Sequence, residues 1–145
     1  MLDEWMQEPN REEWEHQGYM CQIVRHPQAG HLCGYVGIPE GHPWFKKDYS
    51  DIDADVHGGL TYAAYGHDES ESDKGYYKQL TDSKGRKLWW IGFDCNHYGD
   101  MAPYGVSIFE GNYRNMFYVH GQTNRLAAQA QGAEEELASV GSRAD

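Results

Sequence analysis

Residues 51–57 alternate acidic side chains and a histidine with apolar residues, in the order Asp-Ile-Asp-Ala-Asp-Val-His. In an extended strand successive side chains point to opposite faces, so this order predicts one face that carries Asp51, Asp53, Asp55 and His57. Carboxylate oxygens and imidazole nitrogens are common ligands for divalent metal ions. Neighbouring carboxylates repel one another unless water, a cation or basic side chains lie opposite. The run is therefore predicted to be either a solvated face or part of a binding site.

A second polar group follows residues 88–93, the most hydrophobic run of the chain. Asp94, His97 and Asp100 come directly after this run at spacings of three. The run predicts a central strand buried on both faces, and a turn beyond such a strand exposes side chains that the strand holds rigidly. If residues 60–65 form its antiparallel neighbour, the start of that strand meets the end of this one. His57 and Asp94 are then expected to lie close together.

Together the two groups predict a mixed nitrogen and oxygen site for a divalent metal such as Zn, Mn, Mg or Fe. The predicted metal ligands are Asp55, His57, Asp94, His97 and Asp100. Asp94 and His97 are the candidate catalytic pair, and metal-dependent hydrolysis of a phosphoester is the reaction that such a pair would support. A small polar, nucleotide-like ligand is the alternative occupant, for which the candidate binding residues are His42, Trp44, Gly58, Gly59 and Tyr62.

Each feature also has a structural interpretation without function. Alternating carboxylates often form a solvated face, and Asp94 could cap its own turn. The start of the acidic run imitates a calcium loop, but Val56 stands where that loop requires glycine and Tyr62 stands where it requires glutamate, which excludes an EF-hand. A zinc site on Cys21, His26, His31 and Cys33 lacks the close cysteine pair that is typical of such sites.

Composition limits the class of protein. A chain of 145 residues with 14% aromatic and 24% charged residues predicts one folded domain. The net charge of −11 argues against binding to nucleic-acid backbones. The same charge would suit a non-enzymatic acidic inhibitor that imitates nucleic acid and binds a host protein, through Asp68, Glu69, Glu71 and Asp73. The three cysteines, the acidic start and the lack of a long apolar run predict a cytoplasmic protein that does not enter the membrane.

The pattern of the chain predicts an α+β fold, with an antiparallel sheet of about four or five strands and a C-terminal helix packed on one face. Residues 20–25 and 32–38 are expected to form a hairpin, and a short helix is expected over residues 11–17 because Asn10 and Glu13 resemble a capping box. The C-terminal helix is expected from residue 115, with a buried stripe of Met116, Val119, Thr123, Leu126 and Ala130. The domain is predicted to cover residues 1–130, with a frayed tail over 131–145.

Four segments, residues 34–44, 56–62, 90–100 and 113–126, resemble small proteins that are common in bacteriophage and prophage genomes. The two segments that carry most of the likeness read Val-His-Gly-Gly-Leu-Thr-Tyr and Trp-Ile-Gly-Phe-Asp-Cys-Asn-His-Tyr-Gly-Asp. The resemblance implies a phage setting and the importance of these segments, but no particular reaction. It also implies that the chain is a phage accessory protein that counters host defence.

Overall fold

A five-stranded antiparallel sheet and one long helix make up most of the structure. The structure is a computed structural model that describes residues 3–66, 80, 85–97, 99–104 and 111–143. The strands are β1 (Arg11–His16), β2 (Tyr19–Arg25), β3 (Leu32–Ile38), β4 (Tyr62–Tyr65) and β5 (Trp89–Asp94), in the order β1-β2-β3-β5-β4. The helices are α1 (Glu4–Gln7), the 3-10 turn η1 (Tyr49–Asp51) and α3 (Met116–Arg143). The predicted α+β architecture is confirmed.

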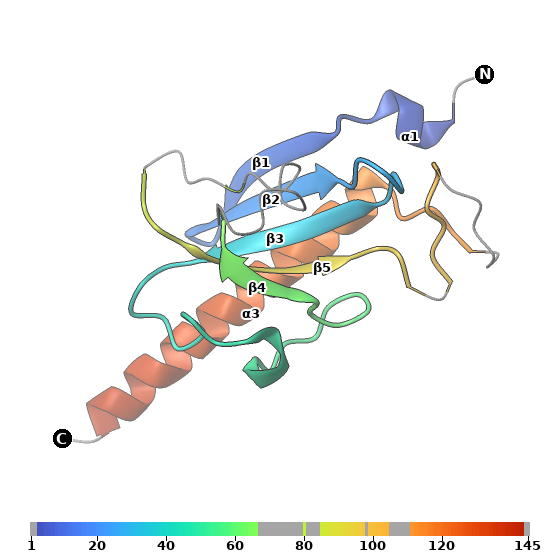
Figure 1. Cartoon of the computed structure of the whole chain (residues 1–145). Helices are drawn as coiled ribbons and strands as arrows, with labels where there is room; N and C mark the ends of the chain where they lie inside the picture. Colours follow the sequence, from blue (N-terminus) through green and yellow to red (C-terminus); the bar gives the residue numbers. More distant parts are fainter. Residues whose placement is uncertain (1–2, 67–79, 81–84, 98, 105–110, 144–145) are drawn as a thin grey trace.

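The long helix α3 crosses one face of the sheet (Figure 1). Every member of its predicted apolar stripe is buried, and side chains such as Ile23, Val36 and Phe93 pack against it from the sheet. The backbones approach closely at Gly34, where an added Cβ would lie 2.3 Å from the Thr123 hydroxyl oxygen. The helix continues past Gly132 to Arg143, so the segment predicted to be a frayed tail over 131–145 is helical as far as Arg143.

The opposite face of the sheet carries a second apolar cluster that includes Tyr35, Leu80 and Trp90. All residues of β2 and β3 are buried because side chains cover both faces of these strands. The predicted hairpin of β2 and β3 and the predicted pairing of β4 with β5 are both confirmed. The end of β5 therefore lies inside the sheet, between β3 and β4, and not at an edge.

The helix expected over residues 11–17 is wrong, because this segment forms β1 at the edge of the sheet. Gln17 and Gly18 have φ of 50° and 87°, which suits a tight hairpin turn into β2. Trp14 faces α3, where its ring nitrogen donates a hydrogen bond to Asn124 Oδ1 at 2.7 Å and its ring stacks on His120. Strand pairing and this aromatic contact outweigh the local capping pattern.

The strand expected over residues 51–57 is also wrong. Asp51 ends η1, and the following residues run in irregular backbone with Ile52 and Val56 buried. Their backbone groups form hydrogen bonds with side chains of α3. Asp55 N–H donates to Gln129 Oε1 at 2.7 Å, and His57 N–H donates to Gln122 Oε1 at 3.0 Å. The helix thus replaces a neighbouring strand as the partner of this segment.

Candidate functional site

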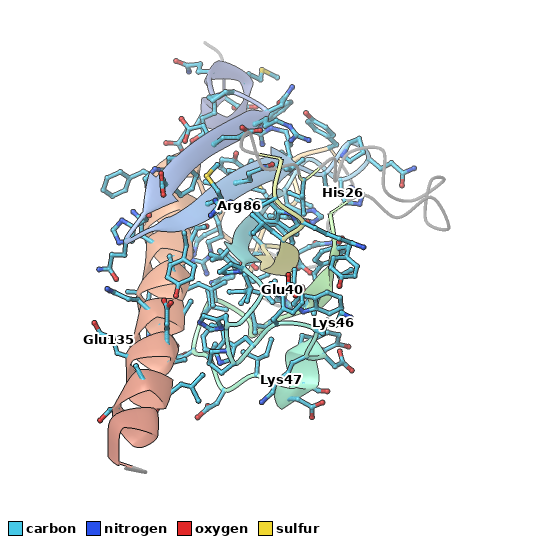
Figure 2. The ribbon with its side chains drawn as sticks, turned by 90° about the vertical axis from the view of Figure 1, so that its left-hand side faces the viewer. His26, Glu40, Lys46, Lys47, Arg86 and Glu135 are labelled. Atoms are coloured by element: carbon cyan, nitrogen blue, oxygen red, sulfur yellow. The ribbon has the colours of Figure 1, made fainter. Side chains whose placement is uncertain are left out.

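A pocket of about 350 Å³ opens where β3 and β4 begin and β5 ends, beside the turn after β5. Cys33 of β3 lies opposite Asp94 of β5, and Tyr35 and Tyr62 meet edge to face on the side of the sheet away from α3. Figure 2 shows His26, one of the lining residues, on this same side. The lining residues are His26, His31, Cys33, Tyr35, Thr61, Tyr62, Phe93, Asp94, Asn96 and His97.

His31 is a buried imidazole of this lining. Its side chain is stacked on His26 with 4.9 Å between ring centroids, and the residue is only 5% exposed. Its Nδ1 has no hydrogen-bond partner among the described residues. Burial, reinforced by the neighbouring His26, lowers the pKa of His31 to about 4. The ring is therefore neutral near pH 7 and keeps one nitrogen unpaired.

His97 and Asp94 form the polar end of the pocket. The two Asp94 oxygens accept hydrogen bonds from the Asn96 N–H at 3.1 Å and the Thr61 hydroxyl at 3.2 Å. His97 Nε2 lies 3.1 Å from Asp94 Oδ1, but the approach is not aligned for a hydrogen bond, so this buried nitrogen also lacks a hydrogen-bond partner among the described residues. Gly58 makes room for the ring, since a Cβ there would lie 2.3 Å from His97 Cδ2.

Behind His97 lies a hydrogen-bonded network centred on Asp100, which is 3% exposed. Asp100 Oδ2 accepts from His57 Nε2 at 2.8 Å and from the His97 N–H at 3.1 Å, and Oδ1 accepts from Arg114 Nε at 2.7 Å. The other nitrogen of His57 lies 2.8 Å from the Tyr118 hydroxyl. This network ties the segment before β4 and the turn after β5 to the start of α3.

The protonation of Asp100 follows from these bonds. Burial alone would raise its pKa, but the hydrogen bonds from Arg114, His57 and the His97 N–H outweigh burial and hold the pKa below its ordinary value. Asp100 is therefore a carboxylate near pH 7, so His57 Nε2 carries a hydrogen and donates a hydrogen bond to Asp100 Oδ2. Both nitrogens of His57 are engaged, so this histidine acts as a support of the turn.

The structure brings together the two segments that the sequence predicts to meet. His57, Asp94, His97 and Asp100 do converge, although only Asp94 and His97 line the pocket. Asp55 lies apart, because it binds Arg125 and Gln129 of α3. Arg125 is about 10 Å along the helix from Tyr118, the partner of His57, at the usual rise per residue.

The predicted ligand-binding residues divide in the same way. Tyr62 lines the pocket and Gly58 packs against the His97 ring, whereas a Cβ at Gly59 would meet nothing within 4 Å. His42 and Trp44 lie outside the pocket lining, under α3. Trp44 N–H donates to His42 Nδ1 at 2.9 Å, so His42 Nε2 carries the proton and donates to the Ala130 carbonyl at 2.7 Å.

The sequence connects three lining residues, His26, His31 and Cys33, only with a zinc site that their spacing does not support. The signal that could have identified them is the pairing of β3 with β5, which brings the turn between β2 and β3 to Asp94. Within the described part of the chain, no group of three or more His, Cys, Asp or Glu side chains is arranged to hold a metal ion. The five-residue metal site remains a prediction.

Comparison with protein-family models, curated proteins and solved structures found no match. The resemblance to phage and prophage proteins therefore stays a prediction from the sequence. Among the described residues, no helix combines the length and the apolar character needed to cross a membrane.

Proposed function

We propose that the chain binds a small polar ligand in the pocket between the ends of β3, β4 and β5. The observation that carries this proposal is that two lining side chains, His31 and His97, each keep a buried nitrogen without a hydrogen-bond partner among the described residues. An unpaired buried polar group costs about 1–3 kcal/mol. A ligand that pairs with these rings, after a small rotation that uncovers the nitrogens, recovers part of that cost.

The size and lining of the pocket support the same proposal. Its volume of about 350 Å³ falls in the range of roughly 300–1,000 Å³ that is usual for small-molecule sites. The aromatic side chains Tyr35 and Tyr62 offer apolar walls, and Thr61, Asp94 and Asn96 offer a few polar groups that can fix the orientation of a ligand. Metal-dependent hydrolysis at Asp94 and His97 remains a further prediction.

The binding proposal is tested by thermal-shift measurements with nucleosides, nucleotides, amines and divalent metal chlorides. A ligand at 100 times its dissociation constant should add about 2.7 kcal/mol to the free energy of unfolding. The stabilisation should be lost in His97→Ala and kept in His16→Ala, a matched change on β1. The proposal fails if no compound stabilises the wild-type protein more than it stabilises His97→Ala.

The acidic inhibitor of a host defence protein stays a second hypothesis, which the net charge of −11 favours. The residues predicted for it, Asp68, Glu69, Glu71 and Asp73, lie outside the described residues. Charge reversal at these four positions should then remove binding to the host protein, whereas His97→Ala should leave that binding unchanged.

A further inference from the structure

The carboxylate of Asp94 differs from the other paired carboxylates in its partners. Asp100, Asp55 and Glu8 each lie beside an arginine, namely Arg114, Arg125 and Arg25. Asp94 accepts its hydrogen bonds from the neutral donors Thr61 and Asn96 N–H, and the imidazole of His97 lies 3.1 Å away without forming a hydrogen bond. The described residues that line the pocket include no lysine or arginine. Among the described residues of the lining, the negative charge of Asp94 is thus balanced by no permanent cation.

The remaining lining suits a positive charge. Tyr35 and Tyr62 meet with 5.4 Å between ring centroids, and aromatic faces attract cations. His31 is neutral near pH 7 and adds no opposing positive charge, because its burial disfavours protonation. The net charge of −11 also raises the local concentration of cations around the molecule.

The geometry points to an organic cation with a planar amidinium or guanidinium head as the ligand of this pocket, and this inference rests on the proposed function. A carboxylate has about four lone-pair positions. Asp94 Oδ1 accepts from Asn96 N–H and Oδ2 accepts from Thr61, and His97 Nε2 lies 3.1 Å from Oδ1 without forming a hydrogen bond. Each oxygen can therefore still accept from one arm of a planar fork. The flat head would lie against the aromatic wall of Tyr35 and Tyr62.

A phosphate group fits this lining poorly. Phosphate sites typically supply arginine, lysine or a row of backbone N–H groups, whereas the strongest charge among the described lining residues is the carboxylate of Asp94. A nucleotide-like ligand would therefore place its base in the pocket, not its phosphate. An organic cation and a nucleotide base differ in the charge of the group that enters the pocket, so the charge of the bound group distinguishes the two ligands.

Three probes of nearly the same shape test the inference: benzamidine, which is cationic, benzamide, which is neutral, and benzoate, which is anionic. Binding is followed by the amide chemical shifts of Thr61, Asn96 and His97 in an NMR titration of the full chain. Benzamidine should bind at least about tenfold more tightly than benzamide, and benzoate should bind more weakly than both. The variant Asp94→Asn should remove the preference, whereas Asp53→Asn, an exposed carboxylate outside the pocket, should keep it.

The outcomes separate this inference from the proposed function. Equal or tighter binding of benzamide or benzoate at these residues overturns the preference for a cation but leaves a ligand pocket in place. The lack of any shift at the three residues with millimolar benzamidine also overturns the inference. An unchanged preference in Asp94→Asn would show that Asp94 does not select the charge. The proposed function fails separately, by the thermal-shift comparison with His97→Ala.

Discussion

Asp100 is a single buried residue that supports the turn after β5, beside the candidate site. Its carboxylate accepts hydrogen bonds from His57, Arg114 and the His97 backbone, so it holds the turn that carries His97. A carboxylate that is 3% exposed is stable only while its charge is balanced and its oxygens are satisfied. The network is therefore a support for the pocket, and its energy belongs to folding.

Asp100→Asn should lower the free energy of unfolding by about 2–3 kcal/mol, measured by urea denaturation. Loss of one partner of a fully buried ion pair costs about 3–5 kcal/mol, and the cost is smaller here because the Arg114 side chain is partly exposed. Asp53→Asn should change the free energy of unfolding by less than about 0.5 kcal/mol, since Asp53 is exposed. An equal effect of the two substitutions would contradict the role of the network.

His31 should make the fold sensitive to mild acid. Its pKa is about 4 in the folded protein and about 6.5 in an unfolded chain, so protons bind the unfolded state more tightly. The contribution of neutral His31 to the free energy of unfolding is fully present above pH 6.5. It falls as the pH drops from 6.5 to 4, by an amount on the order of 3 kcal/mol. Urea denaturation across this range should show a flatter pH dependence in His31→Gln. An unchanged slope in that variant would exclude His31 as the source.

At the scale of elements, the contact of α3 with β3 depends on a residue without a side chain. A Cβ at Gly34 would lie 2.3 Å from Thr123 Oγ1 and 2.6 Å from Phe93 Cε1, so the helix could not keep its present distance from the strand. The glycine lets Thr123 turn its hydroxyl back to the Val119 carbonyl at 2.7 Å within the helix.

Gly34→Ala should therefore destabilise the fold by about 1–3 kcal/mol, the usual cost of overpacking a core. Gly132→Ala is the matched control within α3, where an added Cβ meets nothing within 4 Å. It should stabilise the fold by about 0.5–1 kcal/mol, because alanine favours the helix over glycine. Thermal unfolding of both variants checks the prediction, and a stable Gly34→Ala protein would contradict the close packing.

The elements that sequence predicted correctly are those whose local pattern and burial agree. Residues 88–93 are apolar and, except for Trp89, buried, and the stripe of α3 is buried and mostly apolar, so their hydrophobic patterns alone indicate β5 and α3. The segment of β1 is mostly charged and lies at the sheet edge, where pairing with β2 decides its structure. Residues 51–57 alternate like a strand, but the side chains of Gln122 and Gln129 bind their backbone. Such long-range partners leave no trace in the local pattern.

The candidate site was also predictable in part, where the pairing of neighbouring strands indicates which segments meet. His57 and the acidic turn after β5 were expected to meet because antiparallel β4 and β5 bring these ends together, and they do meet through Asp100. The contribution of His31 was not predictable, because it depends on β3 lying next to β5 in the sheet. That neighbour relation joins residues that are distant in the chain.

At the scale of the whole molecule, the chain is strongly acidic, with a net charge of −11. Figure 2 shows Glu135 on α3 at one side of the molecule and Lys46 and Lys47 at the other. The pocket lies on the face of the sheet that α3 does not cover, and its carboxylate adds to a strongly negative body. Long-range attraction of a cation to this body is screened by salt, with a Debye length of about 10 Å at 0.1 M.

The affinity for benzamidine should therefore fall several-fold between low and high ionic strength, whereas the affinity for benzamide should barely change. Isothermal titration calorimetry at two sodium chloride concentrations measures both. A benzamidine affinity that is independent of salt would show that charge does not contribute to binding.

The central claim, that the pocket holding His31 and His97 is the ligand site, is tested most directly by the imidazole nitrogen shifts in a long-range ¹H–¹⁵N spectrum. The titrant is the compound that stabilises the protein most in the thermal-shift screen. The account predicts shifts of the nitrogens of His31 and His97, with little change at His42 and His57, whose nitrogens are already hydrogen-bonded. Shifts confined to His42 and His57, or no shift at His31 and His97 at saturation, would contradict it.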